Sequence, residues 1–159
     1  MSKKVEHSVT EVKVAESGVL VGRYDHALDP KRRLTIPSEW RALMGNYVYV
    51  MPDPDRRCLD LVSAAEMEVR LAKLRERALF DPALNRALQT IGASSEQLPL
   101  DIQGRIRICD KLLQFANLTT TVAMVGSVRM IKLWSPTELP PEDKVDQKAL
   151  SSALREVGF

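Results

Sequence analysis

The feature that most constrains this chain is a charged pattern that occurs twice, 72 positions apart. Residues 29–36 read Asp-Pro-Lys-Arg-Arg-Leu-Thr-Ile, and residues 101–108 read Asp-Ile-Gln-Gly-Arg-Ile-Arg-Ile. Two later apolar stretches, 59–63 and 131–135, keep the same offset. Such a recurrence indicates one supersecondary unit used twice, with each copy burying its apolar face against the other. The function is then expected where the two charged loops lie together.

Size and composition limit what these units can be. The chain has 159 residues, which fits one compact domain or two small halves fused around one core. Each repeat, at about 40–45 residues, is too small to be stable alone. With 45% hydrophobic and 28% charged residues the composition is that of an ordinary globular protein. A net charge of +2 does not by itself indicate nucleic-acid binding, so that case depends on local clustering of charge.

The compartment and the cysteines follow from simple criteria. No apolar run approaches the ~18 residues that a membrane span needs, and the first residues lack the apolar core of a signal peptide. A cytoplasmic location is therefore expected. Cys58 and Cys109 lie in strand-like stretches without metal-ligand spacing, which predicts reduced, structural thiols.

Alternation and turn residues divide the chain into five segments. They are a flexible N-terminal arm at 1–19, a first repeat at 20–63, a helical insert at 64–97, a second repeat at 98–136 and a charged C-terminal tail at 137–159. The predicted fold class is α+β: two β-hairpin repeats form a pseudo-two-fold β-core with peripheral helices. Each repeat is expected to run strand, loop, strand, short helix, strand, turn, strand.

Periodicity and turn signals give the expected strands and short helices. The strands are 20–28, 33–36, 47–51 and 58–62 in the first repeat, and 98–101, 105–109, 121–125 and 129–134 in the second. Short helices are expected at 39–44, capped by Ser38 and ended by Gly45, and at 110–116. Each repeat should also end in the start of a helix with a Ser-x-x-Glu capping box, Ser63 with Glu66 and Ser135 with Glu138.

The insert and the tail are expected to be helical in part. The first insert helix should span 64–79, and the second should begin at Asp81-Pro82 and end at Gly92, followed by a polar link at 93–97. A weak helix is expected near 147–157 in the tail.

The aspartate and arginine of each charged pattern have a clear chemical relation. Asp29 and Asp101 each end one strand, and Arg33 and Arg105 begin the next. A carboxylate in such a turn can accept backbone N–H bonds and also pair with the guanidinium. Holding a tight turn is a sufficient role for the two aspartates, so this pattern alone leaves a structural and a functional interpretation open.

The arginines favour a functional interpretation more strongly. A period of two points Arg33, Arg105 and Arg107 away from the apolar face, next to Lys31 and Arg32. A planar guanidinium held by a carboxylate suits bidentate contact with guanine or phosphate, and a two-stranded ribbon fits the DNA major groove. The alternative from the residues alone is a solvated charged face.

Residues 22–37, Gly-Arg-Tyr-Asp-His-Ala-Leu-Asp-Pro-Lys-Arg-Arg-Leu-Thr-Ile-Pro, resemble the opening of the MraZ family, whose members have two fused AbrB-like, swapped-hairpin repeats. Residues 100–108 resemble the second signature of that family, and residues 125–126 with 131–134 its closing strands. The resemblance implies a bacterial, sequence-specific DNA-binding transcriptional regulator that acts on promoter repeats upstream of division and cell-wall genes. It also implies a homo-oligomeric ring, associated with the nucleoid.

The resemblance carries over to individual residues. Arg33 and Arg105 match the motif arginines of the family, and Asp29 and Asp101 match its motif carboxylates. The expected partners are double-stranded DNA and further copies of the chain, with no cofactor, metal, membrane or small-molecule substrate. The outward faces of the short strands and the apolar stripe around Met67 and Leu71, which one chain is expected to leave partly uncovered, also favour oligomer formation.

Three positions depart from the family pattern. Arg32 stands where the first motif usually has glycine, as Gly104 does in the second, and a positive φ there would strain or reshape the first loop. Cys109 replaces the proline matched by Pro37. The helix before the second repeat, which is often rich in arginine, has only Arg86.

Other function classes are weaker. The sequence has no nucleophile–base set, no Gly-rich phosphate loop and no metal-ligand spacing, so an enzyme is not expected. His26 alternates into an apolar face and is expected to be a buried structural histidine. The second hypothesis is a ring-forming or antitoxin-like protein-interaction module of the same fold that has lost specific DNA reading. The intact arginine-bearing second motif favours the regulator.

Overall fold

The computed structural model describes residues 18–141 and 146–159. The arm expected at 1–19 therefore lies outside the described residues except for its last two positions. The strands are β1 (Arg23–Ala27), β2 (Arg33–Thr35), β3 (Tyr47–Pro52), β4 (Leu59–Ser63), β5 (Glu96–Pro99), β6 (Arg105–Arg107), β7 (Thr121–Gly126) and β8 (Ile131–Trp134). The helices are α2 (Ser38–Met44), α3 (Ala64–Ala78), α4 (Pro82–Ser94), α5 (Asp110–Phe115) and α6 (Gln147–Glu156).

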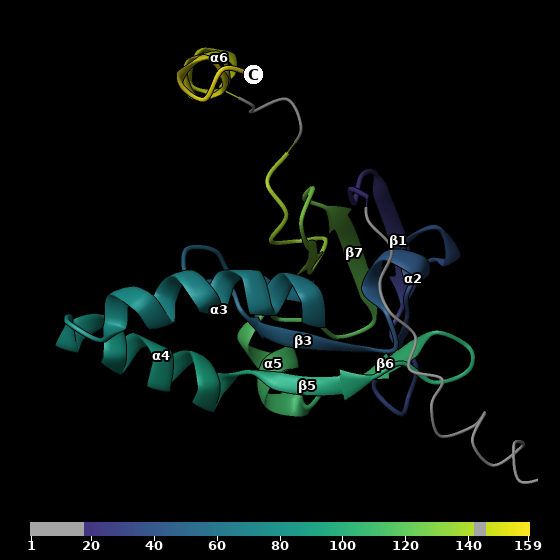
Figure 1. Cartoon of the computed structure of the whole chain (residues 1–159). Helices are drawn as coiled ribbons and strands as arrows, with labels where there is room; N and C mark the ends of the chain where they lie inside the picture. The colour runs from purple at the N-terminus through teal and green to yellow at the C-terminus, as the bar shows by residue number, and fades with distance from the viewer. Residues whose placement is uncertain (1–17, 142–145) are drawn as a thin grey trace, which may run out of the picture.

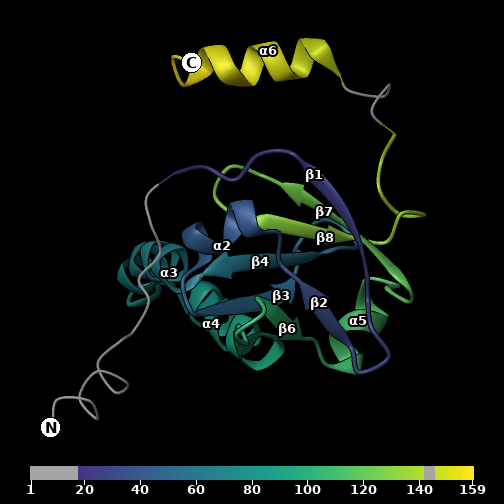
Figure 2. The ribbon, with the colours of Figure 1, turned by 90° about the vertical axis from the view of Figure 1, so that its right-hand side faces the viewer.

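The strands form one six-stranded sheet and one ribbon, both symmetric about their centres. The sheet has the order β1-β7-β8-β4-β3-β5, and the ribbon pairs β2 with β6. All pairs are antiparallel, with Asp60 opposite Lys132 in the sheet and Leu34 opposite Ile106 in the ribbon. Both facing pairs are 72 residues apart, so one pseudo-two-fold relation describes the sheet and the ribbon (Figure 2). The fold is α+β, as predicted.

The two repeats exchange their edge strands. From the first repeat, β1 pairs with β7 of the second, and β5 of the second pairs with β3 of the first. The ribbon likewise takes one strand from each repeat. Each half therefore completes the sheet of the other, which gives them a common core.

That core forms where the ribbon and the short helices close over the sheet. In the ribbon, Leu34 and Ile106 are buried, because alternation turns them inward. From α2, Trp40 is buried and stacks edge-on against Tyr24, with ring centroids 4.9 Å apart. Every residue of β4 is buried at the middle of the sheet. Figure 1 shows the α3–α4 hairpin extending from one side of the sheet, where its base packs on β3 and β4.

Helix caps explain where most helices begin. The Ser63 hydroxyl accepts the N–H of Glu66 at 3.1 Å, which confirms the predicted start of α3. The Glu66 carboxylate binds Arg70 at 2.9 Å instead of completing a capping box. The predicted Ser38 cap is wrong, because α2 follows Pro37 and has no side-chain cap. Gly45, with a φ of 76°, ends α2 as predicted.

Two predicted boundaries before the second repeat are wrong. Gly92 does not end α4, which continues to Ser94. The hydroxyl of Ser95 donates to the carbonyl of Ile91 at 2.5 Å, so a side chain satisfies a carbonyl of the last helical turn. The polar link expected at 93–97 is wrong as well, because β5 begins at Glu96 and pairs with β3.

The predicted helix start at Ser135 is also wrong. Glu138 N–H donates to the Ser135 carbonyl at 2.9 Å, which makes a turn, and Pro140 and Pro141 follow after Leu139. A helix after the Ser-x-x-Glu pattern needs further residues whose backbone N–H groups donate to the preceding turn. Prolines have no such N–H group, so the helix does not continue.

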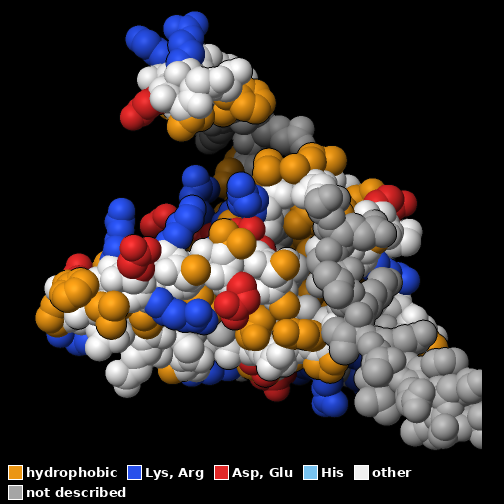
Figure 3. All heavy atoms as spheres, viewed as in Figure 1, with side chains coloured by type: hydrophobic (Ala, Val, Ile, Leu, Met, Phe, Trp, Pro, Cys, Tyr) orange, Lys and Arg blue, Asp and Glu red, His pale blue; other side chains and the backbone are white. Residues whose placement is uncertain are grey.

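Large apolar side chains are exposed at the tip of the α3–α4 hairpin. Leu79 is 77% exposed and Phe80 is 90% exposed at the far end of the α3–α4 hairpin, where Figure 3 shows apolar surface. Met67 is buried within the chain, whereas Leu71 is half-buried and lines an apolar pocket, so the oligomer expected from this stripe stays a prediction. Among the described residues, no helix combines the length and the apolar character that crossing a bilayer requires.

Candidate nucleic-acid interface

The β2–β6 ribbon presents basic side chains on its outer face. Arg33 is opposite Arg107, and Thr35 is opposite Arg105, with the buried Leu34–Ile106 pair between them. Because neighbouring residues of a strand point to opposite faces, the arginines lie on the side away from the core. The side chain of Arg33 is 31% exposed and that of Arg105 is 27% exposed, whereas Arg107 is largely exposed.

Loop 1, residues 29–33, is organised by the carboxylate of Asp29. Its Oδ1 accepts the N–H of Lys31 at 2.9 Å and that of Arg33 at 2.8 Å. Its Oδ2 accepts from Arg33 Nε at 2.7 Å. One carboxylate therefore fixes both the backbone of the turn and the direction of the guanidinium.

Loop 2, residues 101–105, repeats these bonds. Asp101 Oδ1 accepts the N–H of Gln103 and that of Arg105, both at 2.9 Å, and Oδ2 accepts from Arg105 Nε at 2.7 Å. No Nη atom of Arg33 or Arg105 makes a hydrogen bond within the described ranges 18–141 and 146–159. Each guanidinium is thus oriented through Nε, and its outer edge remains available to a ligand.

The same hydrogen bonds set the ionisation of the two loops. The backbone N–H of Arg33 is the largest cause that holds the pKa of Asp29 below its usual range, and the Arg33 side chain adds to it. The backbone N–H of Arg105 does the same for Asp101. Both carboxylates are therefore ionised at neutral pH, and each remains bound to its arginine.

The residue before each arginine takes a left-handed conformation in both loops. Gly104 has a φ of 76°, and Arg32 has a φ of 66°. Loop 1 is therefore strained and keeps its shape, since its hydrogen bonds match those of loop 2. The Arg32 guanidinium crosses to the other repeat, where its Nε lies 2.8 Å from Asp110 Oδ1.

Gly104 has a second reason to be glycine. A Cβ at this position would overlap the side chain of Arg41 from α2. Arg41 Nε donates to the carbonyl of Ile36 at 2.7 Å, at the end of β2. Arg41 thus closes the end of the ribbon next to loop 2, a role that the sequence analysis missed because this arginine lies outside the repeated pattern.

The two loops lie at opposite ends of the ribbon. The carbonyl of Arg32 accepts the N–H of Ile108 at 3.0 Å, and that of Gly104 accepts the N–H of Ile36 at 2.8 Å. Each loop is therefore bonded to the end of the other repeat's strand. A shallow hollow of about 210 Å³ joins Arg33 to Asp101, Arg105 and Arg107. The two loops are therefore not in direct contact at one end of the ribbon, but the short ribbon and this hollow make them neighbours on one surface.

The tip of loop 2 carries two exposed side chains that the charge pattern of the sequence does not single out. Ile102 is 100% exposed, and Gln103 is exposed beside it. They occupy the positions that Pro30 and Lys31 hold in loop 1. Reading the two repeats against each other at these positions, beyond the shared aspartate and arginine, would have identified them.

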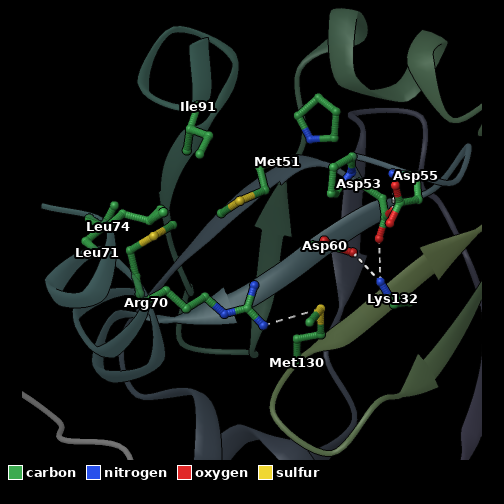
Figure 4. Close-up of a pocket in the computed structure, with 13 residues that line it drawn as sticks. Met51, Asp53, Asp55, Asp60, Arg70, Leu71, Leu74, Ile91, Met130 and Lys132 are labelled. Atoms are coloured by element: carbon green, nitrogen blue, oxygen red, sulfur yellow. Dashed lines mark hydrogen bonds and ion pairs between the residues drawn. The ribbon is translucent and has the colours of Figure 1, made fainter. Parts of the chain in front are cut away.

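A second polar group lies at the centre of the sheet, at the edge of an apolar pocket of about 380 Å³ (Figure 4). The ammonium of Lys132 lies 2.9 Å from Asp60 Oδ1 and also binds Asp53. Burial raises the pKa of Asp60 to about 6. Burial opposes the ionisation of Asp53 too, but the bonds from Lys132 and from the backbone of Asp55 hold its pKa below the usual range. This cluster joins the two repeats, and the offset of 72 between Asp60 and Lys132 is the signal that was overlooked.

The cysteines and the histidine are not part of the basic surface. Both Cys58 and Cys109 are free thiols, and burial raises the pKa of Cys58 to about 12. Ligand atoms of Asp53, Cys58 and Asp60 lie within 4.8 Å of one another, close enough for a metal ion. The Lys132 ammonium binds both carboxylates and supplies the positive charge there. His26 is partly exposed, so the expectation that it is buried is wrong.

Comparison with known proteins agrees with the fold and the loop pattern. No protein-family model matches the sequence. A transcriptional regulator MraZ from Rhodospirillum rubrum is 31% identical over 146 residues, which cover 87% of this chain and 92% of that protein. One from Corynebacterium jeikeium is 32% identical over 113 residues, covering 71% and 78%. One from Clostridium acetobutylicum is 27% identical over 143 residues, covering 89% and 100%. Because the Rhodospirillum rubrum regulator is 31% identical over most of both chains, and because the paired Asp–Arg loops fit the family pattern, this chain belongs to the MraZ family.

Proposed function

We propose that this protein is a non-enzymatic, sequence-specific DNA-binding transcriptional regulator that acts on promoter repeats upstream of division and cell-wall genes. The observation that carries the proposal is the outer face of the ribbon, where Arg33 and Arg105 are each oriented by a carboxylate of their own loop. The names of the similar proteins support a role in transcription.

Charge and shape of the ribbon fit duplex DNA. Its cationic groups, which outnumber the carboxylates beside them, are Lys31, Arg32, Arg33, Arg105 and Arg107. A strand of three residues spans about 10 Å, or roughly three base-pair steps, so the two loops reach neighbouring positions on one duplex. In this arrangement Arg33 and Arg105 contact bases, and the other cations contact mainly phosphates.

A binding titration tests the proposal. The full chain is titrated on DNA from upstream of its own gene and on the same DNA with a shuffled sequence, at two salt concentrations. We expect tighter binding to the native DNA and a loss of this preference in Arg33→Ala/Arg105→Ala. Arg86→Ala is the matched control, since it removes an exposed arginine from α4, away from the ribbon. Unchanged binding by the double variant would exclude the ribbon as the DNA-binding surface.

We also propose that copies of the chain assemble into a ring. The exposed Leu79 and Phe80 support this, because adjacent large apolar side chains at the tip of a helical hairpin form a surface that a partner can cover. Light scattering at micromolar concentration should give a multiple of the chain mass, and Phe80→Asp should lower it. A single-chain mass for the unaltered protein would contradict the proposal.

We also propose that the chain consists of an arm, two repeats, a helical insert and a tail, and that the two repeats share one core and are not separable domains. Exchange of β1 and β5 between the repeats supports it, because neither repeat alone completes the sheet. A fragment of residues 1–92 should then lack a cooperative unfolding transition. A stable, monomeric fragment would show that the halves are independent.

The second candidate function is an interaction module that has lost DNA reading. The strained Arg32 in loop 1 is the observation that favours it, since Arg32 is engaged by Asp110. Equal and weak binding to native and shuffled DNA by a correctly assembled oligomer would support this alternative.

A further inference from the structure

Loops 1 and 2 have the same backbone but carry different side chains at their tips. Loop 1 has Pro30 and Lys31, whereas loop 2 has Ile102 and Gln103 at the matching positions. Because the hydrogen bonds to Asp29 and to Asp101 agree within 0.1 Å, position by position, the tips are presented by equivalent turns. Any difference in what they bind therefore comes from the side chains.

Ile102 is an unusual residue for a loop tip. Its side chain is 100% exposed and lies between Asp101 and Gln103, both fixed by the hydrogen bonds of the loop. A single exposed isoleucine is ordinary on a protein surface. This one lies on the loop that orients Arg105, so a ligand of Arg105 comes within its reach.

Gln103 adds a complementary chemistry. Its backbone N–H is bound by Asp101, and its exposed side chain makes no hydrogen bond within the part of the chain that the structure describes. A glutamine amide can donate to N7 and accept from N6 of adenine, and an apolar side chain packs on the methyl group of thymine. Together the two residues match the two bases of one A·T pair.

Loop 1 lacks both groups. Lys31 is a donor without an acceptor, and its ammonium suits a phosphate oxygen better than a base edge. Arg32 points to Asp110 of the other repeat. The tip of loop 1 is therefore suited to phosphate contact, which positions a protein on DNA without reading sequence.

We propose that Ile102 and Gln103 specify an A·T pair beside the base pair read by Arg105, while the tip of loop 1 binds phosphates. This inference rests on the proposed function. It makes the two halves of one ribbon unequal readers, so that one chain recognises DNA in a single orientation.

Selection from a randomised duplex library tests the inference. The full-length protein should enrich sequences with a fixed A·T pair next to a G·C pair. Gln103→Ala and Ile102→Ala should each lower the preference at that A·T position by about tenfold, in line with the discrimination of one good base contact. The matched variant Lys31→Ala should weaken all sequences alike and keep the preference. Gln103→Arg should shift the preference at this position to G·C, because a guanidinium binds guanine.

Melting curves of each variant show whether it folds, and the loop 2 variants should melt like the wild type, because Asp101 holds the backbone of loop 2. An A·T preference that survives in Gln103→Ala, Ile102→Ala and Gln103→Arg would overturn the inference while leaving the proposed function intact. Failure of the unaltered protein to enrich any sequence would instead overturn the proposed function, and this inference with it.

Discussion

Loop 1 and loop 2 make the same hydrogen bonds, but they have different residues at the left-handed position before the arginine. Loop 2 uses Gly104 at a φ of 76°, whereas loop 1 forces Arg32 to a φ of 66°. A left-handed residue with a side chain costs about 1–2 kcal/mol. The Arg32–Asp110 pair is exposed and offsets at most about 1 kcal/mol. The carboxylate, with its three bonds, therefore decides the shape of the loop, and glycine only lowers the strain of that shape.

The two repeats also differ at the centre of the sheet, where one supplies Asp60 and the other Lys132. Lys132→Met should give the largest effect, a loss of about 3–5 kcal/mol in the free energy of unfolding, because two buried carboxylates lose their cation. Urea unfolding measures it, with the exposed Arg129→Met as the control. A loss no greater than that of the control would mean that the pair does not join the repeats.

The pH dependence of stability sharpens this result. Burial raises the pKa of Asp60 to about 6 in the folded chain, above the unfolded value of about 4. The protonated carboxyl of Asp60 then contributes fully to the free energy of unfolding below about pH 4, and this contribution is lost as the pH rises through 6. Asp60→Asn should therefore gain stability relative to the wild type as the pH rises from 4 to 7. A constant difference between the two proteins over this range would contradict the shift.

Gly104→Arg converts loop 2 into a copy of loop 1 and comes next in size. The new side chain must displace Arg41, which binds the carbonyl of Ile36, and the backbone must bear a left-handed arginine. We expect a loss of about 1–3 kcal/mol in the free energy of unfolding. Thermal unfolding measures it, and Gly92→Arg in α4, where a Cβ meets no atom within 4 Å, is the control. Equal melting of both variants would remove the role assigned to Arg41.

Removing the motif arginines one at a time tests whether the two loops contribute equally to the proposed DNA binding. Each of Arg33→Ala and Arg105→Ala should cost about 1–3 kcal/mol of binding free energy per contact. The departure at Arg32 suggested a distorted loop 1, but the matching hydrogen bonds remove that reason for an unequal effect. The difference now rests on the loop tips: Arg105→Ala should reduce the ratio of specific to random binding more than Arg33→Ala does. Equal ratios in a fluorescence titration would make the loops equivalent.

Arg32→Gly should have the smallest effect. Relief of the strained φ and loss of the pair with Asp110 nearly balance, so the change in stability should stay within about 1 kcal/mol. Calorimetry measures it. If Arg32 binds one phosphate, the slope of the salt dependence of DNA binding should also fall by about 0.9 in this variant. A destabilisation of several kcal/mol would mean that the bridge to Asp110 holds the repeats together.

Much of the fold follows from local patterns in the sequence. The offset of 72 identified both loops, and alternation placed Leu34 and Ile106 on the buried side. Patterns failed where a distant partner decides the outcome. Glu96 begins a strand because β3 lies beside it and because its side chain accepts the N–H of Cys109 at 3.3 Å, neither of which the segment 93–97 reveals.

The candidate site was predictable in its framework and less so in its details. The shared Asp and Arg positions were evident because both repeats keep them. Arg41 lies in only one repeat, and Ile102 has no charge, so neither belonged to a pattern of charged residues. The role of Arg41 depends on a tertiary contact, because the fold brings α2 next to Gly104 of loop 2.

The pairing of Asp60 with Lys132 across the pseudo-two-fold also decides which halves of the chain fit together. If a half of the chain paired with the same half of another copy, it would bury two aspartates or two ammonium groups face to face. Such homotypic pairing is repelled, whereas exchange of unlike halves between chains keeps every ion pair intact. The charges of Asp60 and Lys132 therefore favour the pairing of unlike halves and disfavour the pairing of like halves.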